Sequence, residues 1–179
     1  MAVITEFPRQ NIYLIGARAS GKSTIGKILA TQLGWSFAET DELAQEILGR
    51  SISAAVNELG WEVFRRAESE SLKRLAALER TVVSTGGGIV LRQENCELMH
   101  KTGTVVYLKA SACELEKRLL KNSGGRPSLT GAHPAKEIAV VLEEREALYE
   151  ALAHLTVNAH SSAREVAKRL AAIIRRGGR

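Results

Sequence analysis

Several residue classes are scarce in this chain of 179 residues. It has two cysteines, Cys96 and Cys113, too few for a disulfide framework and without the spacing of metal ligands. Aromatic residues make up 4% of the chain and do not alternate with basic ones, so a base-stacking surface is not expected. A run of about 18 apolar residues is lacking, which argues against a membrane-spanning helix. Residues 1–10 lack the pattern of a signal peptide, so we expect a cytoplasmic protein.

The remaining composition is that of a soluble globular domain, with 45% hydrophobic and 25% charged residues. The formal net charge is +5 at pH 7. A positive balance favours anionic partners, which include nucleic acid, an anionic membrane surface and phosphorylated or carboxylated small molecules. Charge alone does not choose among these partners.

Hydrophobic patterning predicts alternating strands and helices. Strands are predicted at residues 11–15, 35–38, 81–84, 104–108 and 155–157. Helices are predicted at residues 22–33, 41–48, 53–59, 62–78, 92–99, 111–121, 135–153 and 162–174. Strands separated by helices imply a parallel sheet with right-handed crossovers. We therefore predict an α/β fold in which residues 1–179 form one domain, a three-layer α/β/α sandwich around a five-stranded parallel sheet.

The run Gly16-Ala17-Arg18-Ala19-Ser20-Gly21-Lys22-Ser23 matches the phosphate-binding P-loop, and it lies between a predicted strand and a predicted helix. Backbone N–H groups of such a turn converge on a phosphate chain, and the helix N-terminus adds a partial positive charge. Lys22 would reach the outer phosphates, and the Ser23 hydroxyl would face Mg²⁺. The predicted nucleotide-binding residues of this loop are Ala19, Ser20, Gly21, Lys22, Ser23 and Thr24.

Two carboxylates, Glu39 and Asp41, follow the second predicted strand and should share a sheet edge with the P-loop. One could hold Mg²⁺, and the other could accept a proton from a substrate hydroxyl. Alternatively, Asp41 only caps the next helix. The strand at 81–84 has no acidic end, unlike the magnesium strand of motor-like and GTPase P-loop proteins, so the pattern favours a small kinase.

A triplet of glycines, Gly86, Gly87 and Gly88, follows the third predicted strand. Such a run suits a place where a ligand approaches the backbone closely, although a plain turn is the alternative. Arg126 lies in a Gly/Pro-rich segment, where a kinase needs a lid that excludes water and adds positive charge. Arg66 is expected to be a solvated surface charge.

The order of these motifs resembles the shikimate kinase family, small P-loop kinases of the nucleoside-monophosphate-kinase-like group. The resemblance covers residues 11–158. The matching stretches are 16–26, 39–41, 64–68, 85–88, 126–129 and 143–149. It implies transfer of a phosphoryl group from ATP to shikimate with Mg²⁺, giving shikimate 3-phosphate in aromatic amino-acid biosynthesis.

The resemblance also implies residue roles. Lys22, Asp41 and Arg126 would be catalytic, with Asp41 on the substrate hydroxyls and Arg126 reaching ATP from the lid. Ser23 and Glu39 fall at the Mg²⁺ positions. Arg164 is assigned to the ATP site. The implied substrate-binding residues are Asp41, Arg65, Gly86, Gly87, Gly88 and Arg145, with the two arginines on the substrate carboxylate.

The resemblance also implies two functional segments, and the chain departs from the family pattern at one position. A segment at about 41–78 would bind substrate, and one at about 122–134 would form the lid. The family usually has Asp where this chain has Glu39, which moves the carboxylate by roughly one carbon–carbon bond and affects Mg²⁺ affinity. The alternatives are a gluconate-kinase-like sugar-acid kinase and a ligand-sensing module that lacks turnover. The expected partners are ATP and shikimate, with no nucleic acid, no membrane and no second subunit.

Overall fold

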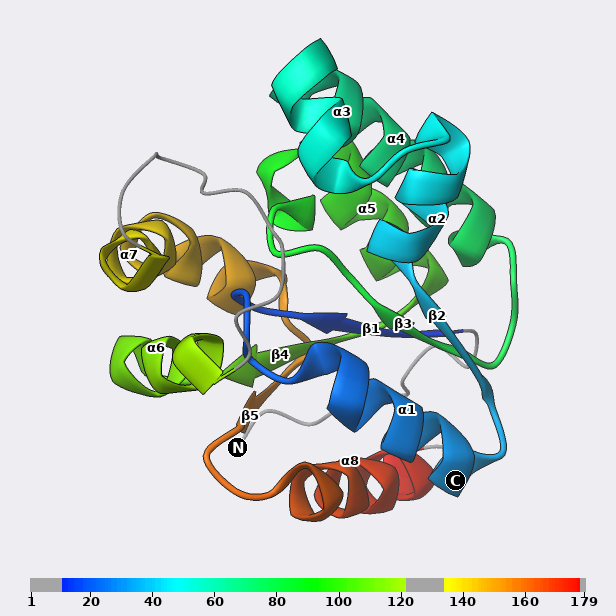
Figure 1. The fold of residues 1–179 in the computed structure, drawn as a ribbon. Helices are drawn as coiled ribbons and strands as arrows, with labels where there is room; N and C mark the ends of the chain where they lie inside the picture. The colour runs from blue at the N-terminus through cyan, green and yellow to red at the C-terminus, as the bar shows by residue number, and fades with distance from the viewer. Residues whose placement is uncertain (1–10, 122–133, 178–179) are drawn as a thin grey trace.

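Short apolar segments form the strands of one parallel sheet in the computed structural model, which describes residues 11–121 and 134–177 (Figure 1). The strands are β1 (Asn11–Ile15), β2 (Ser36–Glu39), β3 (Thr81–Ser84), β4 (Gly103–Lys109) and β5 (Leu155–Asn158). Their order across the sheet is β2-β3-β1-β4-β5, and every neighbouring pair is parallel. The predicted five-stranded parallel sheet is confirmed.

Helices cover both faces of this sheet. They are α1 (Lys22–Leu33), α2 (Thr40–Leu48), α3 (Ile52–Leu59), α4 (Trp61–Ala76), α5 (Gln93–Thr102), α6 (Ala112–Lys121), α7 (Pro134–Leu152) and α8 (Ala163–Gly177). A single 3₁₀ turn, η1 (Ile89–Leu91), follows the triple glycine. In the described ranges no helix is both long and apolar enough to cross a membrane.

Every residue of the central strand β1 is buried, because helices cover both of its faces. Ile12 and Leu14 point to one face and pack with α1 and α8, whereas Tyr13 and Ile15 point to the other face and pack with α4, α5 and α7. Successive side chains of a strand alternate between faces, so a strand covered on both sides needs a continuous apolar run. The two cores make the predicted three-layer sandwich.

Most predicted element ends lie within a few residues of the observed ones, and local signals explain several of them. Gly34 ends α1 in the left-handed region at φ 68°, and its N–H reaches the carbonyls of Ala30 and Thr31. Ser111 and Glu114 form the expected capping box before α6, because each side chain accepts a hydrogen bond from the other residue's N–H. The second strand begins and ends one residue later than predicted, so Glu39 is its last residue.

The carboxyl ends of β1, β2 and β3 bring the candidate site together. Because the three strands are parallel neighbours, the P-loop, Glu39 and the triple glycine emerge at one edge of the sheet. The buried Thr40 hydroxyl accepts a hydrogen bond from the N–H of Gly86 at 2.9 Å. The N–H and hydroxyl of Thr85 both donate to the carbonyl of Leu14. These bonds hold the three strand ends in register with one another.

Candidate functional site

The P-loop has the backbone conformation that its sequence predicts. Gly16 and Gly21 have φ values of 141° and 93°, and Ala19 has φ 65°, a left-handed conformation that residues other than glycine rarely adopt. A Cβ atom at Gly16 would lie 2.9 Å from the carbonyl oxygen of Leu108, so only glycine fits there. The loop therefore turns sharply from β1 into α1.

Lys22 folds back over this loop. Its side chain is buried, and its ammonium group donates to the carbonyls of Gly16 and Ala17, each at 2.8 Å, and to the Ser20 hydroxyl at 3.3 Å. Carbonyl oxygens are weaker partners for an ammonium group than phosphate oxygens are. The arrangement therefore holds a cation in the cradle of the loop, where the phosphates of a nucleotide would lie.

A pocket opens beside the loop, and we call it the P-loop pocket. All the predicted nucleotide-binding residues from Ala19 to Thr24 line it, together with Glu39, Asp41, Ser84, Thr85 and Arg118. The exposed Ser23 hydroxyl lies 3.4 Å from that of Ser84. One buried carboxylate oxygen of Glu39, Oε1, has no hydrogen-bond partner among the described residues. Burial of a carboxylate oxygen without a partner is costly, so this atom fits the place of a cation or its water.

These groups suit Mg²⁺ better than a transition metal. Mg²⁺ keeps several waters and is commonly held by one or two protein oxygens together with substrate phosphates. Ser23 and Glu39 offer such oxygens at the same pocket as Lys22. Within residues 11–121 and 134–177 no cluster of three or more His, Cys, Asp or Glu side chains could hold a metal by itself.

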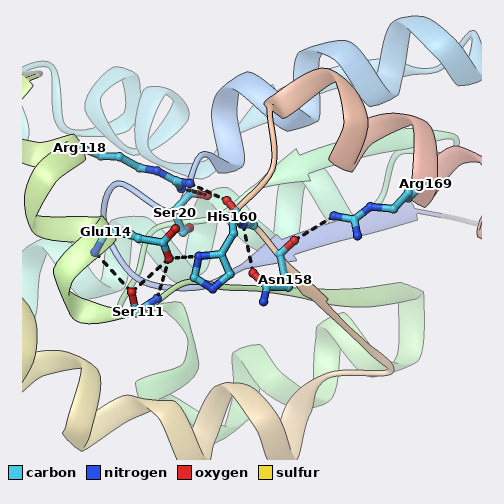
Figure 2. A network of polar contacts seen from close by, with 8 residues as sticks. Ser20, Ser111, Glu114, Arg118, Asn158, His160 and Arg169 are labelled. Carbon is cyan, nitrogen blue, oxygen red and sulfur yellow. Dashed lines mark hydrogen bonds and ion pairs between the residues drawn. The ribbon is translucent and has the colours of Figure 1, made fainter.

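Arg118 is a residue of the P-loop pocket that the sequence reasoning missed. Its guanidinium donates to the carbonyl of Ser20 in the loop and, at 2.5 Å, to the carbonyl of Ala159 after β5 (Figure 2). The neighbouring Glu114 of α6 pairs with His160, which lies in the loop between β5 and α8, so this pair is a second link between α6 and that loop. These contacts connect α6 with the P-loop and the β5–α8 loop.

A second pocket adjoins the first, and we call it the arginine pocket. Arg65 and Arg145 line it, together with Gly86–Gly88, Glu68 and Tyr149. Asp41 and Arg18 line both pockets. A group in the arginine pocket would therefore meet a group in the P-loop pocket beside the buried carboxylate of Asp41. The apolar side of the arginine pocket includes Ile52, Trp61, Phe64, Ile138 and Val141.

Arg65 is held by aromatic rings and a buried acid. Its guanidinium lies 5.3 Å from the ring centroids of both Trp61 and Phe64, and it donates to Glu68 at 2.6 Å. Glu68 is only 1% exposed, so burial raises the pKa of its carboxyl group, while the charge and hydrogen bond of Arg65 oppose that rise. Arg65 therefore enters the pocket with its orientation already fixed.

The three glycines have different neighbours. A Cβ at Gly86 would lie 2.2 Å from a carboxylate oxygen of Glu68 and 2.8 Å from one of Asp41. A Cβ at Gly88 would lie 2.2 Å from the Arg65 guanidinium. At Gly87 the nearest atoms would be 3.5 Å or more away. Gly86 and Gly88 thus make room for charged side chains of α2 and α4, and a plain flexible turn does not explain them.

Arg145 reaches the same turn from α7. Its side chain is buried, one Nη donates to the carbonyl of Gly87 at 3.4 Å, and its Nε has no partner among the described residues. Tyr149, one helical turn later, donates to the same carbonyl at 2.5 Å. Two cationic side chains, Arg65 and Arg145, therefore face one cavity, an arrangement that suits a carboxylate.

The other predicted residues fall in different places. Arg126 and nearly all of the expected lid lie outside the described residues. Arg164 is exposed on α8, and its neighbour Ala163 lines the P-loop pocket while Arg164 does not, so the assignment of Arg164 to ATP stays a prediction. Arg66 is exposed and pairs with Glu62, as expected.

The sequence held a signal for some of the missed residues. Glu68 ends the 64–68 stretch and Tyr149 ends the 143–149 stretch, and both stretches belong to the resemblance. Their closeness to Gly86 and Gly87 depends on long-range packing, which no local pattern shows. Arg118 belongs to no stretch that signalled a site.

Known proteins similar to this chain share its length and fold. The family model described as shikimate kinase matches residues 18–175. A shikimate kinase of Oleidesulfovibrio alaskensis is 48% identical over 171 residues, covering 94% of this chain and 99% of that protein. The structure of a shikimate kinase from Acinetobacter baumannii in complex with shikimate superposes with a TM-score of 0.87 at 30% identity, covering 93% of each chain.

A gluconokinase structure from Sinorhizobium meliloti is more distant. It has a TM-score of 0.59 at 20% identity and covers 94% of this chain and 93% of that one. This likeness extends to the fold alone, so it gives no support to the sugar-acid kinase alternative.

Proposed function

The chain belongs to the shikimate kinase family, and from that premise we propose that it transfers the γ-phosphoryl group of ATP to a hydroxyl of shikimate. The products are ADP and shikimate 3-phosphate, and the reaction is a step of aromatic amino-acid biosynthesis. The observation that carries the proposal is the meeting of the P-loop pocket and the arginine pocket at Asp41. A kinase needs its two substrates side by side with a polar group at the contact.

ATP would occupy the P-loop pocket. Lys22 would exchange its contacts with the Gly16 and Ala17 carbonyls for the outer phosphate oxygens. Ser23 and Glu39 would hold Mg²⁺, directly or through water, and the ion would neutralise charge on the phosphates. The orphaned Oε1 of Glu39 supports this assignment. Arg126 remains our prediction for the lid cation.

Shikimate would occupy the arginine pocket. Its carboxylate would pair with Arg65 and Arg145, because guanidinium groups bind carboxylates through two parallel hydrogen bonds. Asp41 would accept a hydrogen bond from the reacting hydroxyl and take up its proton as the phosphoryl group moves. Backbone groups of Gly86–Gly88 would contact the acceptor at the place where no side chain intervenes.

An assay of ADP release with ATP, Mg²⁺ and shikimate tests the proposal, with gluconate as the control acceptor. We expect turnover with shikimate, none with gluconate, and loss of turnover when a chelator removes Mg²⁺. Binding of shikimate without turnover would favour a ligand-sensing module. Turnover with gluconate instead would favour the sugar-acid kinase.

A second experiment separates the two pockets. Arg145→Ala should raise the KM for shikimate by roughly 10- to 100-fold, the cost of a lost charge-assisted pair, and leave the KM for ATP nearly unchanged. Arg66→Ala, on the exposed face of α4, is the matched control and should change neither constant. A higher KM for ATP in Arg145→Ala would mean that Arg145 serves the P-loop pocket.

A monomeric enzyme in the cytoplasm with no nucleic-acid or membrane partner stays a prediction. Size-exclusion chromatography with light scattering would test the monomer directly, because a dimer would have twice the chain mass of 19.4 kDa.

A further inference from the structure

Tyr149 combines full burial with polar contacts to Gly87 and Arg145. Its side chain has 0% exposure, and its ring stacks on that of Tyr107 from β4, with centroids 5.2 Å apart and planes inclined by 26°. The stacked ring fixes where the hydroxyl points. That hydroxyl donates to the carbonyl of Gly87, 62 positions earlier in the chain, at 2.5 Å. Burial raises the pKa of Tyr149 to about 12, so the hydroxyl stays protonated and remains a donor at neutral pH.

The same carbonyl has a second donor. One Nη of Arg145 lies 3.4 Å from the Gly87 oxygen, which is long for a hydrogen bond. The Tyr149 hydroxyl therefore supplies the stronger contact, and the guanidinium of Arg145 need not turn fully toward the backbone. If that hydroxyl were lost, the part-buried Gly87 carbonyl would lose its shorter hydrogen bond, and the Arg145 guanidinium would turn toward it and away from the pocket.

The bond also acts on the glycine turn. A peptide group is planar, so a fixed Gly87 carbonyl also fixes the direction of the Gly88 N–H. Both glycines line the arginine pocket, and neither has a side chain that could hold the turn by packing. Glycine is also the residue with the greatest backbone freedom, which makes an external anchor more important here.

We propose that Tyr149 is a positioning residue of the arginine pocket: its hydroxyl anchors the Gly87 carbonyl and thereby sets both the backbone turn and the direction of Arg145. Tyr149 acts through these two residues and transfers no proton itself. The inference rests on the proposed function for its effect on catalysis, while the anchoring is a property of the protein without substrate.

Two matched variants test it. Tyr149→Phe removes the anchoring hydroxyl and keeps the ring. Tyr107→Phe removes the hydroxyl of the stacked partner, which is buried and has no hydrogen-bond partner among the described residues. We expect Tyr149→Phe to raise the KM for shikimate roughly 5- to 30-fold, the range for a lost buried hydrogen bond, with the KM for ATP unchanged. Tyr107→Phe should keep the kinetic constants of the parent protein.

The split between the two KM values separates positioning from a merely structural role. Loss of thermal stability in Tyr149→Phe with both KM values unchanged would overturn the proposal. Equal rises of both KM values would overturn it as well, because the effect would then not be confined to the arginine pocket.

Nuclear magnetic resonance tests the anchoring without any turnover. In the substrate-free protein, the Gly88 amide and the Arg145 Nε–H resonances should shift in Tyr149→Phe and keep their positions in Tyr107→Phe. Unmoved resonances in Tyr149→Phe would overturn the proposal whatever the kinetics show. If the parent protein lacks shikimate-dependent turnover, the proposed function fails, and the resonances still decide whether Tyr149 anchors the turn.

Discussion

The two pockets of this site are built in different ways. The P-loop pocket takes its main donors from one stretch, Gly16 to Thr24, whose backbone folds around the place for the phosphates. The arginine pocket combines charged side chains of α2, α4 and α7 with the glycine turn after β3, so these members lie far apart in the sequence. The first is a local motif, and the second is a product of tertiary packing.

This difference predicts how each pocket tolerates change. In the P-loop pocket, Lys22 donates to atoms of Gly16, Ala17 and Ser20, which lie within six positions of it, so the loop carries much of its own geometry. In the arginine pocket, Arg65, Glu68 and Gly88 fit together only because α4 packs against the glycine turn. In this pocket, a methyl group added at a glycine that touches a charged side chain should weaken shikimate binding as much as the loss of a charge does.

The largest effect is expected where the two pockets meet. Asp41→Asn keeps the shape of the side chain and removes the base, so kcat should fall by roughly 100- to 10,000-fold. The adjacent Glu42→Gln, on an exposed side chain of the same helix, is the control and should retain activity. A kcat within a few-fold of the parent value in Asp41→Asn would show that Asp41 is not the catalytic base. The alternative that Asp41 only caps the next helix is wrong, because α2 begins at Thr40 and its N-cap residue is Glu39.

A smaller effect is expected from Gly88→Ala, which tests the packing of the arginine pocket. Gly88 has φ −98°, an angle that alanine adopts readily, so the cost comes from the collision with Arg65. The displaced guanidinium should raise the KM for shikimate by about ten-fold and leave the KM for ATP unchanged.

A double-mutant cycle sharpens this experiment. If the added methyl acts through Arg65, Gly88→Ala should cost much less in an Arg65→Ala background than in the parent protein. Additive costs in the double variant would show that Gly88 matters to shikimate by another route, such as its own backbone.

The smallest effect on activity is expected from a change at His154, at the edge of the sheet opposite to the two pockets. His154 precedes β5, and its Nδ1 accepts a hydrogen bond from the N–H of Val105 at 2.9 Å. Burial lowers the pKa of His154, and the ring of His100, 4.2 Å away between centroids, adds to the lowering. An acceptor nitrogen cannot carry a proton, so protonation of Nδ1 breaks this bond.

The sign of the pH dependence follows from that shift. The folded-state pKa lies below the unfolded value of about 6.5, so the stabilisation is complete above pH 6.5 and is lost as pH falls through the folded-state pKa. His154→Asn, which keeps an acceptor and does not titrate, should flatten the fall of Tm below pH 6.5 by a few degrees. Both KM values at pH 7.5 should match the parent values. An unchanged slope of Tm against pH would show that another group titrates.

Much of the fold was predictable because its signals are local. The strands are continuous apolar runs, the end of α1 is marked by Gly34, and the start of α6 by Ser111 and Glu114. The 3₁₀ turn after Gly88 was not predicted, because three residues carry no periodicity.

The sequence alone determined the P-loop, since its glycines, Lys22 and Ser23 are contiguous and their chemistry follows from the backbone path they impose. It also pointed to Asp41, because parallel strands end at one edge of the sheet. Only the tertiary structure decided that Glu68 holds Arg65, that Gly86 and Gly88 make room for these charges, and that Tyr149 anchors Gly87. The physical reason is that these contacts join positions far apart along the chain, whose approach depends on how whole helices pack on the sheet.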